Sequence, residues 1–361
     1  MRYRNPSLGG LALVGAAAWG QADLGSPYFG GAPPRPAFVM PESLGAWPQQ
    51  REGIRSTLWA LLGDLPPRPA PVRAELVSRE RRAGYVLEKL VLDNGAGAPM
   101  PAYLLVPEGL TTPAPAVLYH HYHGGQYDNG KEELSKTDHP VPGASPAEAF
   151  TRRGYVVLCI DALCFGERRR QGPAGAREEG AATELSLFKM LAWQGRTLWG
   201  MMVRDDQIAL DYLCSRPEVD PGRIAALGMS MGSTRTWWLA ALDERVKVSV
   251  CVACLTRYQD LIHEGLLSAH GIYYYVPNML RHFDTEAVVA LIAPRPLLTL
   301  TGDQDSGSPV EGVRTISATC EALYRLHGAP EQFRGIVYPG VGHEWTEGMW
   351  SETLAWLERW L

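Results

Sequence analysis

Residues 223–232, with the sequence RIAALGMSMG, contain a serine whose surroundings favour nucleophilic chemistry. Ser230 occupies the centre of a Gly-x-Ser-x-Gly pattern, directly after an apolar stretch typical of a strand and directly before one typical of a helix. A serine at such a turn takes a strained backbone conformation that lifts its hydroxyl out of the fold, and the flanking glycines let strand and helix pass closely. The pattern is weak alone, but this context predicts a nucleophile.

A nucleophilic serine needs a base to take its proton and a carboxylate to orient that base. The apolar run 296–301 predicts a buried strand that leads into a turn with two carboxylates, Asp303 and Asp305. Catalytic groups gather at the carboxyl ends of the strands in such sheets. Both aspartates are therefore candidates for the orienting acid.

A candidate base follows a second strand-like run, residues 333–338. The loop Pro-Gly-Val-Gly-His-Glu presents His343 after two glycines, and an amphipathic helix pattern comes next. A histidine held between a strand and a helix in this way can accept a serine proton. We predict His343 as the general base.

Acyl transfer also needs backbone N–H donors for the oxygen that becomes negative when a carbonyl is attacked. The residue after the nucleophile, Met231, is the first expected donor. The second should lie in the loop after an earlier strand, and residues 116–125 supply a strand pattern that ends in His-Gly-Gly. Gly124 and Gly125 are the predicted contributors.

The same run offers a different interpretation, a metal cluster of His120, His121 and His123. Strand alternation points His120 away from its neighbour, and no Asp-His pair follows at the spacing of metallohydrolases. Cys251 and Cys254 have metal-like spacing, but their apolar surroundings and the lack of a second pair favour core packing. We expect neither a metal nor an organic cofactor.

The elements that must position these residues follow an α/β pattern. An N-terminal helix is expected over residues 48–62, with Pro48 in its first turn and Gly63 at its end. About eight strands are expected in a mostly parallel sheet with helices on both faces, the first two forming an antiparallel edge. The predicted strands span residues 85–92, 101–106, 115–121, 155–161, 223–229, 246–253, 297–301 and 334–338.

Three regions are expected along the chain. Residues 1–22 resemble a signal peptide, with arginines before a short apolar stretch that ends in small residues. Residues 23–80 read as an arm and a helix packed on the body, and residues 81–361 as the catalytic domain. A signal peptide favours export to the periplasm or medium, whereas unpaired cysteines in apolar patterns suit a reducing cytoplasm, so the location stays open.

Two long inserts, residues 162–195 and 255–283, follow strands on the side where the catalytic loops emerge, which favours lids or pocket walls. The first contains Glu-Arg-Arg-Arg at 167–170, a pattern typical of a solvated turn and, less often, of a carboxylate-binding feature. The second contains three successive tyrosines that either stack on a substrate or pack in the fold. The candidate substrate-binding residues are His123, Tyr273, Tyr274 and Tyr275.

Composition excludes some classes of function. A net charge of −5 argues against a basic surface that binds nucleic acid. The apolar part of residues 1–22 is too short to span a membrane. With 46% hydrophobic residues the chain can bury a large core. A homo-oligomer is compatible with the pattern but not required by it.

Taken together, these motifs resemble the α/β-hydrolase superfamily, in the dienelactone hydrolase-like branch that includes bacterial acetyl xylan esterases and related carboxylesterases. Residues 153–161, 211–224 and 292–298 are similar to that branch as well. The resemblance implies Gly-x-x-Asp after the acid strand, which selects Asp305 over Asp303. It also implies a cofactor-free ester hydrolase that acts through an acyl-enzyme on a small-molecule or carbohydrate ester. Dienelactone hydrolases proper carry a cysteine where this chain has Ser230, so their lactone substrate is not implied.

Two alternatives stay open. A serine peptidase of the prolyl oligopeptidase type shares this catalytic domain, although 361 residues leave no room for its propeller. A hydrolase-fold binding protein without chemistry is the second alternative, and the intact set of serine, aspartate and histidine argues against it.

Overall fold

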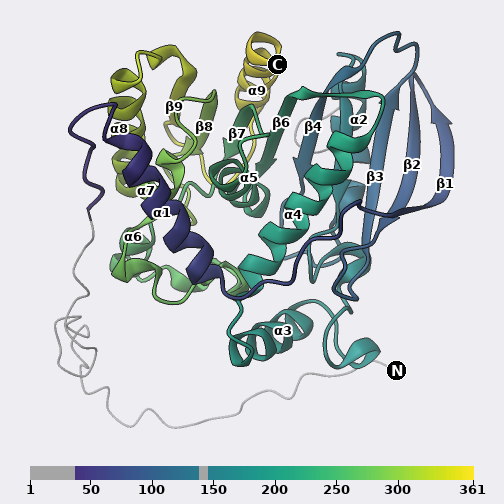
Figure 1. Ribbon diagram of the computed structural model, residues 1–361, viewed down its shortest axis with the longest axis horizontal. Coiled ribbons are helices and arrows are strands. Elements are labelled where there is room, and N and C mark those ends of the chain that lie inside the picture. The colour runs from purple at the N-terminus through teal and green to yellow at the C-terminus, as the bar shows by residue number, and fades with distance from the viewer. Residues whose placement is uncertain (1–36, 138–144) are drawn as a thin grey trace. The chain divides into compact units, whose positions relative to one another are not determined.

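The structure is a computed structural model that describes residues 37–137 and 145–361. The described residues form a nine-stranded sheet with helices around it (Figure 1). The strands are β1 (Ala74–Arg82), β2 (Tyr85–Leu92), β3 (Met100–Pro107), β4 (Ala114–His120), β5 (Val156–Ile160), β6 (Val219–Met229), β7 (Val248–Val252), β8 (Leu297–Gly302) and β9 (Phe333–Tyr338). The helices are α1 (Trp47–Leu62), α2 (Pro146–Thr151), α3 (Ala181–Trp193), α4 (Leu198–Ser215), α5 (Met231–Leu242), α6 (Tyr258–His263), α7 (Thr285–Ala290), α8 (Val310–Leu326) and α9 (Glu347–Trp360).

The strand order is β1-β2-β3-β5-β4-β6-β7-β8-β9. The pairs β1/β2, β2/β3 and β3/β5 are antiparallel, and every pair from β5/β4 onward is parallel. Parallel strands share a direction, so the loops after β4, β6, β8 and β9 leave the sheet at the same edge. This topology confirms the predicted α/β-hydrolase fold.

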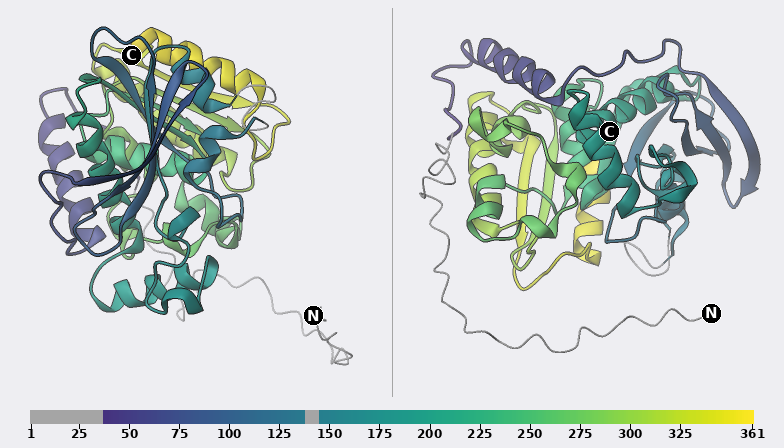
Figure 2. Two further views of the ribbon diagram at one scale, coloured as in Figure 1. Left: turned by 90° about the vertical axis from the view of Figure 1, so that its right-hand side faces the viewer. Right: turned by 90° about the horizontal axis from the view of Figure 1, so that it is seen from below.

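The central strands bury both faces of the sheet, which explains their continuous apolar runs. Successive residues of a strand alternate between the two hydrophobic clusters: Leu118 packs with α4 and α5, and Val117 packs with α2 and α9. Figure 2 shows helices on both sides of the sheet, as predicted.

Helix α1 confirms the predicted N-terminal helix. A proline stands in its first turn, and Gly63 ends it with a φ of 93°, a conformation that glycine adopts without a Cβ clash. Trp47 and Leu58 are buried, and the Arg51 guanidinium bonds Glu244 and the carbonyl of Leu291. The helix is therefore packed on the body.

Strand β1 corrects the prediction of about eight strands. Eight of its nine residues are exposed, and five are charged, so its sequence AELVSRERR carries no alternating apolar signal. It pairs with β2 along its length, so β1 rather than the β2/β3 pair forms this edge of the sheet. The sheet thus begins at Ala74, inside the region assigned to the N-terminal arm and before the boundary at residue 81.

The inserts follow β5 and β7 and contact each other through α3 and the short helix Ile272–Tyr274. The first insert corrects the predicted solvated turn, because the Arg168 side chain has no exposed surface and forms an ion pair with the Asp205 carboxylate at 2.8 Å. Residues 1–22, read as a signal peptide, lie outside the described residues. Among the helices that the structure describes, none has the length and apolar character needed to cross a membrane.

Candidate active site

Ser230 lies at the turn between β6 and α5. Its backbone has φ 58° and ψ −120°, a region that side-chain-bearing residues rarely adopt, and its amide donates to the carbonyl of Val252 at 2.9 Å. Neighbouring backbone therefore holds the strained conformation in place. This is the strand-turn-helix geometry that the sequence context predicts.

The two glycines of the motif are needed because three backbone segments meet here. A Cβ on Gly228 would overlap the carbonyl oxygen of His120, and so would a Cβ on Gly232. Strand β4, strand β6 and the first turn of α5 therefore approach one another without side chains between them. The close approach fixes where α5 begins and hence where the serine hydroxyl lies.

The structure brings the three predicted catalytic side chains together. His343 Nε2 lies 2.8 Å from Ser230 Oγ, and His343 Nδ1 lies 2.9 Å from Asp305 Oδ1. The aspartate follows β8 and the histidine follows β9, so residues distant in sequence meet at one sheet edge. The Asp305 side chain is fully buried, whereas 37% of the His343 side chain is exposed. The site is open to solvent on the histidine side.

The Asp305 carboxylate is held by several donors. Besides the histidine, the amide of Gly307 donates to Oδ1 at 2.8 Å and the Ser308 hydroxyl donates to Oδ2 at 3.1 Å. Burial acts to raise the pKa of this carboxyl, but the hydrogen bond and charge of His343 and these donors outweigh it, so the pKa lies below its usual value. Asp305 therefore stays ionised and keeps accepting from Nδ1.

One predicted oxyanion donor is well placed. Met231 is the first residue of α5, and the first N–H groups of a helix have no partner within that helix. Its amide directly follows the serine. It therefore remains available to a negative oxygen beside Ser230.

The loop after β4 corrects one of the two predicted glycines. The Gly125 amide already donates to His123 Nδ1 at 2.8 Å, and the Tyr122 amide donates to the Glu133 carboxylate at 2.8 Å. Within the described part of the chain, the amides of His123 and Gly124 make no hydrogen bond. The available donors in this loop are therefore His123 and Gly124, and the His123 amide was missed because glycines dominate the motif.

His270 and Thr256, two residues of the site that carry no sequence motif, fix the acid loop. The carbonyl of Gly307 accepts from the Thr256 hydroxyl at 2.6 Å and lies 2.8 Å from His270 Nε2. The amide of Gly307 donates to Asp305. The second insert therefore anchors the loop that carries the acid. No pattern in the sequence links position 270 to position 307.

The three histidines of the first loop have separate partners. His120 Nδ1 lies 2.9 Å from the Thr236 hydroxyl, while His121 bonds two backbone groups, the Tyr122 carbonyl and the Ala162 amide. Among the residues that the structure describes, no group of three or more His, Cys, Asp or Glu side chains is arranged to hold a metal ion. These histidines connect loops and strands.

The cysteines at 251 and 254 point into different surroundings. Cys251 is fully buried in the core, and Cys254 Sγ lies 3.8 Å from Ser230 Oγ. Burial raises the pKa of both thiols, so they remain protonated at neutral pH. They contribute packing, as their apolar surroundings predict.

The candidate substrate-binding residues do not form one surface. Tyr273 is buried and stacks on Trp199, and Tyr274 is buried and stacks on His270. Tyr275 is 60% exposed. The ring of His123 packs against Tyr273 and other aromatic rings, and burial lowers its pKa. Packing therefore accounts for Tyr273 and Tyr274, and only Tyr275 presents its ring to solvent.

Comparisons with known proteins agree with this fold. Over 307 residues the chain is 40% identical to the protein named "Putative hydrolase YtaP" from Bacillus subtilis (strain 168), an alignment that covers 85% of this chain and 98% of that protein. Solved structures of similar fold include a glucuronoyl esterase from Solibacter usitatus, with a TM-score of 0.63, 18% identity, and coverage of 90% of this chain and 98% of the other. Acetyl xylan esterase 1 from Thermoanaerobacterium sp. JW/SL YS485 has a TM-score of 0.57, 18% identity, and coverage of 89% and 99%.

The model of the Abhydrolase family matches residues 34–341, which include the serine turn, the acid loop and the strand before the histidine loop. Both this match and the 40% identical relative extend over most of the chain. The chain therefore belongs to the Abhydrolase family.

Proposed function

We propose that this protein is a serine esterase that hydrolyses carboxylic esters through an acyl-enzyme. The observation that carries the proposal is the continuous series of hydrogen bonds from Ser230 Oγ through the His343 ring to Asp305. A hydroxyl is a weak nucleophile unless a base removes its proton as it attacks. This series supplies that base and the group that orients it.

In the first half of the reaction, His343 Nε2 takes the proton of Ser230 while Oγ attacks the ester carbonyl carbon. Asp305 accepts from Nδ1–H, which keeps Nε2 free to act as the base, and it stabilises the imidazolium that forms. The imidazolium then gives its proton to the alcohol oxygen as the carbon–oxygen bond breaks. The alcohol leaves, and the acyl group remains on the serine.

The tetrahedral intermediate carries a negative oxygen. The Met231 amide and the amide of His123 or Gly124 are available to donate to it. In the second half, His343 takes a proton from water, the hydroxide attacks the acyl carbon, and Ser230 regains its proton from the imidazolium as the carboxylic acid leaves. Apart from this water molecule, both halves use groups of this chain.

For the substrate, we propose acetylated carbohydrates or other small esters. The support is the likeness to a glucuronoyl esterase and an acetyl xylan esterase, together with a nucleophile that lies beside an exposed histidine. A panel of acetylated sugars, aliphatic esters and aryl esters would rank these classes by kcat/KM.

Hydrolysis of p-nitrophenyl acetate tests the mechanism. Ser230→Ala should lower kcat by about 10³-fold or more, because the nucleophile is lost while the strained turn still accepts an alanine. Ser268→Ala, at an exposed position of the second insert, is the matched control and should keep wild-type turnover. A fluorophosphonate probe should label the wild-type protein and not the Ser230 variant. Near-normal turnover by Ser230→Ala would refute the proposal.

A further inference from the structure

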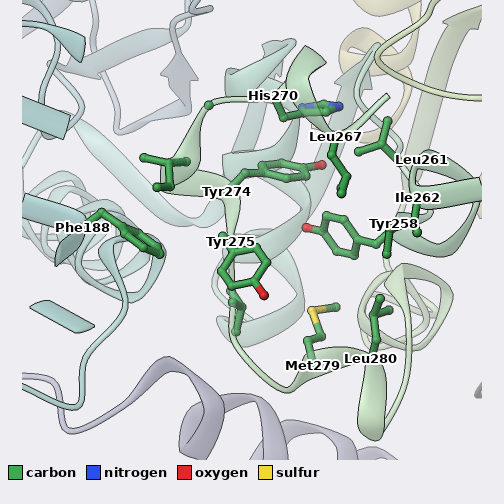
Figure 3. A pocket seen from close by; sticks show the side chains of 13 residues that line it. Phe188, Tyr258, Leu261, Ile262, Leu267, His270, Tyr274, Tyr275, Met279 and Leu280 are labelled. Atoms are coloured by element: carbon green, nitrogen blue, oxygen red, sulfur yellow. The ribbon is translucent and has the colours of Figure 1, made fainter. Parts of the chain in front are cut away.

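The second insert and helix α3 enclose a cavity of about 470 Å³ (Figure 3). Apolar side chains form most of its wall, among them Phe188 from α3, Ile262 from α6, and Leu267 and Met279 from the loops that follow. Ser230 and its two partners are not part of this wall. The cavity therefore borders the catalytic site through His270, which also holds the acid loop, and does not include the three reacting side chains.

Two stacked rings in the wall of the cavity contact segments that also carry the catalytic residues. His270 and Tyr274 both line the cavity, and their ring centroids are 4.6 Å apart with planes 13° from parallel. His270 Nε2 lies 2.8 Å from the carbonyl oxygen of Gly307, and the Tyr274 hydroxyl lies 3.4 Å from Thr234 Oγ1. Contacts with Gly307 and Thr234 hold both rings in place. A molecule in the cavity would therefore pack against a fixed aromatic wall.

The cavity contains one prominent polar anchor. The Tyr258 hydroxyl is buried beside the Tyr274 hydroxyl and the Trp238 indole, and neither gives it a hydrogen bond of full geometry. Its ring packs edge-on against Tyr274, and Figure 3 shows the hydroxyl directed toward the space between the lining side chains. A poorly aligned hydrogen bond contributes little, so a bound donor or acceptor would give this hydroxyl a better one.

The cavity opens to solvent past apolar groups. Leu267 is 55% exposed and Tyr275 is 60% exposed, and both line the cavity. None of the described residues that line it is Lys, Arg, Asp or Glu. A charged ligand would lose its hydration there without gaining a counter-charge.

We propose that this cavity is a second binding site, which takes a small uncharged aromatic molecule with one hydroxyl group. Its volume lies within the range of pockets that hold small ligands, roughly 300 to 1,000 Å³. The rings of Phe188, Tyr274 and Tyr275 offer faces and edges for an aromatic ligand, and the Met279 thioether adapts to its outline. The Tyr258 hydroxyl exchanges one hydrogen bond with it. A sugar, with hydroxyls all around its ring, would leave most of them unpaired.

The binding test does not depend on ester hydrolysis, because it is carried out on the Ser230→Ala protein as well as on the wild type. N-phenyl-1-naphthylamine, whose fluorescence rises in apolar surroundings, is titrated into each protein and then displaced with 1-naphthol. Ile262→Trp fills the cavity from a partly exposed wall, and Leu267→Arg places a charge at its opening. Each should weaken probe binding about tenfold or more, whereas Leu44→Trp, at an exposed apolar position outside the cavity, should leave it unchanged.

The anchor is tested by a matched pair of ligands. Tyr258→Phe should weaken 1-naphthol about tenfold and leave naphthalene unchanged, since only the hydroxyl is removed. Wild-type probe affinity in both Ile262→Trp and Leu267→Arg would overturn the site. Tighter binding of 2-naphthoate than of 1-naphthol would overturn the ligand class, and competitive inhibition of ester hydrolysis by 1-naphthol would overturn the separation from the catalytic site.

Discussion

The carboxylate of Asp303 accepts a hydrogen bond from the amide of Gly340, with 2.7 Å between Oδ1 and the amide nitrogen. Two residues further on, Asp305 accepts from His343 instead. The two neighbouring aspartates therefore have different tasks. Asp303 holds the loop that carries the histidine, and Asp305 orients the histidine ring.

This difference predicts that two similar substitutions change kcat to very different extents. Asp305→Asn should lower kcat for p-nitrophenyl acetate by about 10⁴-fold, because an amide facing Nδ1 favours the wrong tautomer. Asp303→Asn keeps an oxygen that can accept from Gly340, so its kcat should stay within about threefold of wild type. Equal losses in the two variants would contradict the assignment of Asp305 as the orienting acid.

Gly232→Ala should damage both folding and activity. The added Cβ would overlap the carbonyl oxygen of His120, so α5 would have to shift away from β4. Overpacking of this kind typically lowers the free energy of unfolding by about 1 to 3 kcal/mol. Urea denaturation measures this loss, and kcat should fall as the serine moves from His343. Gly348→Ala, in the first turn of α9 where a Cβ meets nothing closer than 3.9 Å, is the control and should lose neither property.

His121 should make the protein less stable in acid. Burial and the charge of Arg235 together lower its pKa from an ordinary value of 6.5 to about 3. Below pH 6.5 the unfolded chain binds a proton that the folded protein refuses, so stability falls as pH decreases toward 3. The neutral ring is also needed structurally, because Nδ1–H faces the Tyr122 carbonyl while Nε2 accepts from the Ala162 amide.

The measurement compares urea unfolding at about pH 6 and pH 5. In His121→Gln the drop in unfolding free energy between these two values should be smaller than in the wild type by about 1 kcal/mol, since one such histidine contributes close to 1.4 kcal/mol per pH unit. His263→Gln, at an exposed position, should reproduce the wild-type drop. An unchanged drop in the His121 variant would mean that its ring takes up a proton within the fold.

Arg168 and Arg170 belong to one arginine run but should differ sharply in their effect on stability. Arg168→Met removes the nearer of the two guanidinium groups beside the buried Asp205 carboxylate and leaves Arg204 at 3.6 Å, which should cost about 3 kcal/mol of unfolding free energy. Arg170 and Glu179 are each 55% exposed, so Arg170→Met should cost less than about 1 kcal/mol. Thermal or urea unfolding of the two variants checks the contrast. Similar losses would show that the burial of Arg168 does not govern its contribution.

The sequence predicted those parts of the site that depend on local pattern. Glycines around Ser230 mark a backbone turn, and apolar runs before Asp305 and His343 mark parallel strands whose ends must meet. The structure places all three side chains in hydrogen-bond contact. Local signals were sufficient because strand direction converts sequence order into position at one edge of the sheet.

The features that escaped prediction depend on contacts between distant segments. Nothing near His270 indicates that its ring faces the Gly307 carbonyl, since the insert that carries it has no periodic pattern. The sequence pattern around Arg168 is typical of the surface, and only the fold brings its guanidinium next to Asp205. The sequence does not show that the Gly125 amide donates a hydrogen bond to the ring of His123. Each depends on the path of a loop, which residue spacing alone does not determine.

Among the described residues, β1 is an edge strand, because β2 is the one strand that pairs with it. Backbone donors and acceptors on such an edge invite pairing with another chain, and charged side chains discourage it. Glu75, Arg79, Glu80, Arg81 and Arg82 give β1 this protection, whereas Leu76 and Val77 are the uncharged stretch within it. The same charges that make this strand hard to recognise from hydropathy thus discourage edge-to-edge pairing through β1.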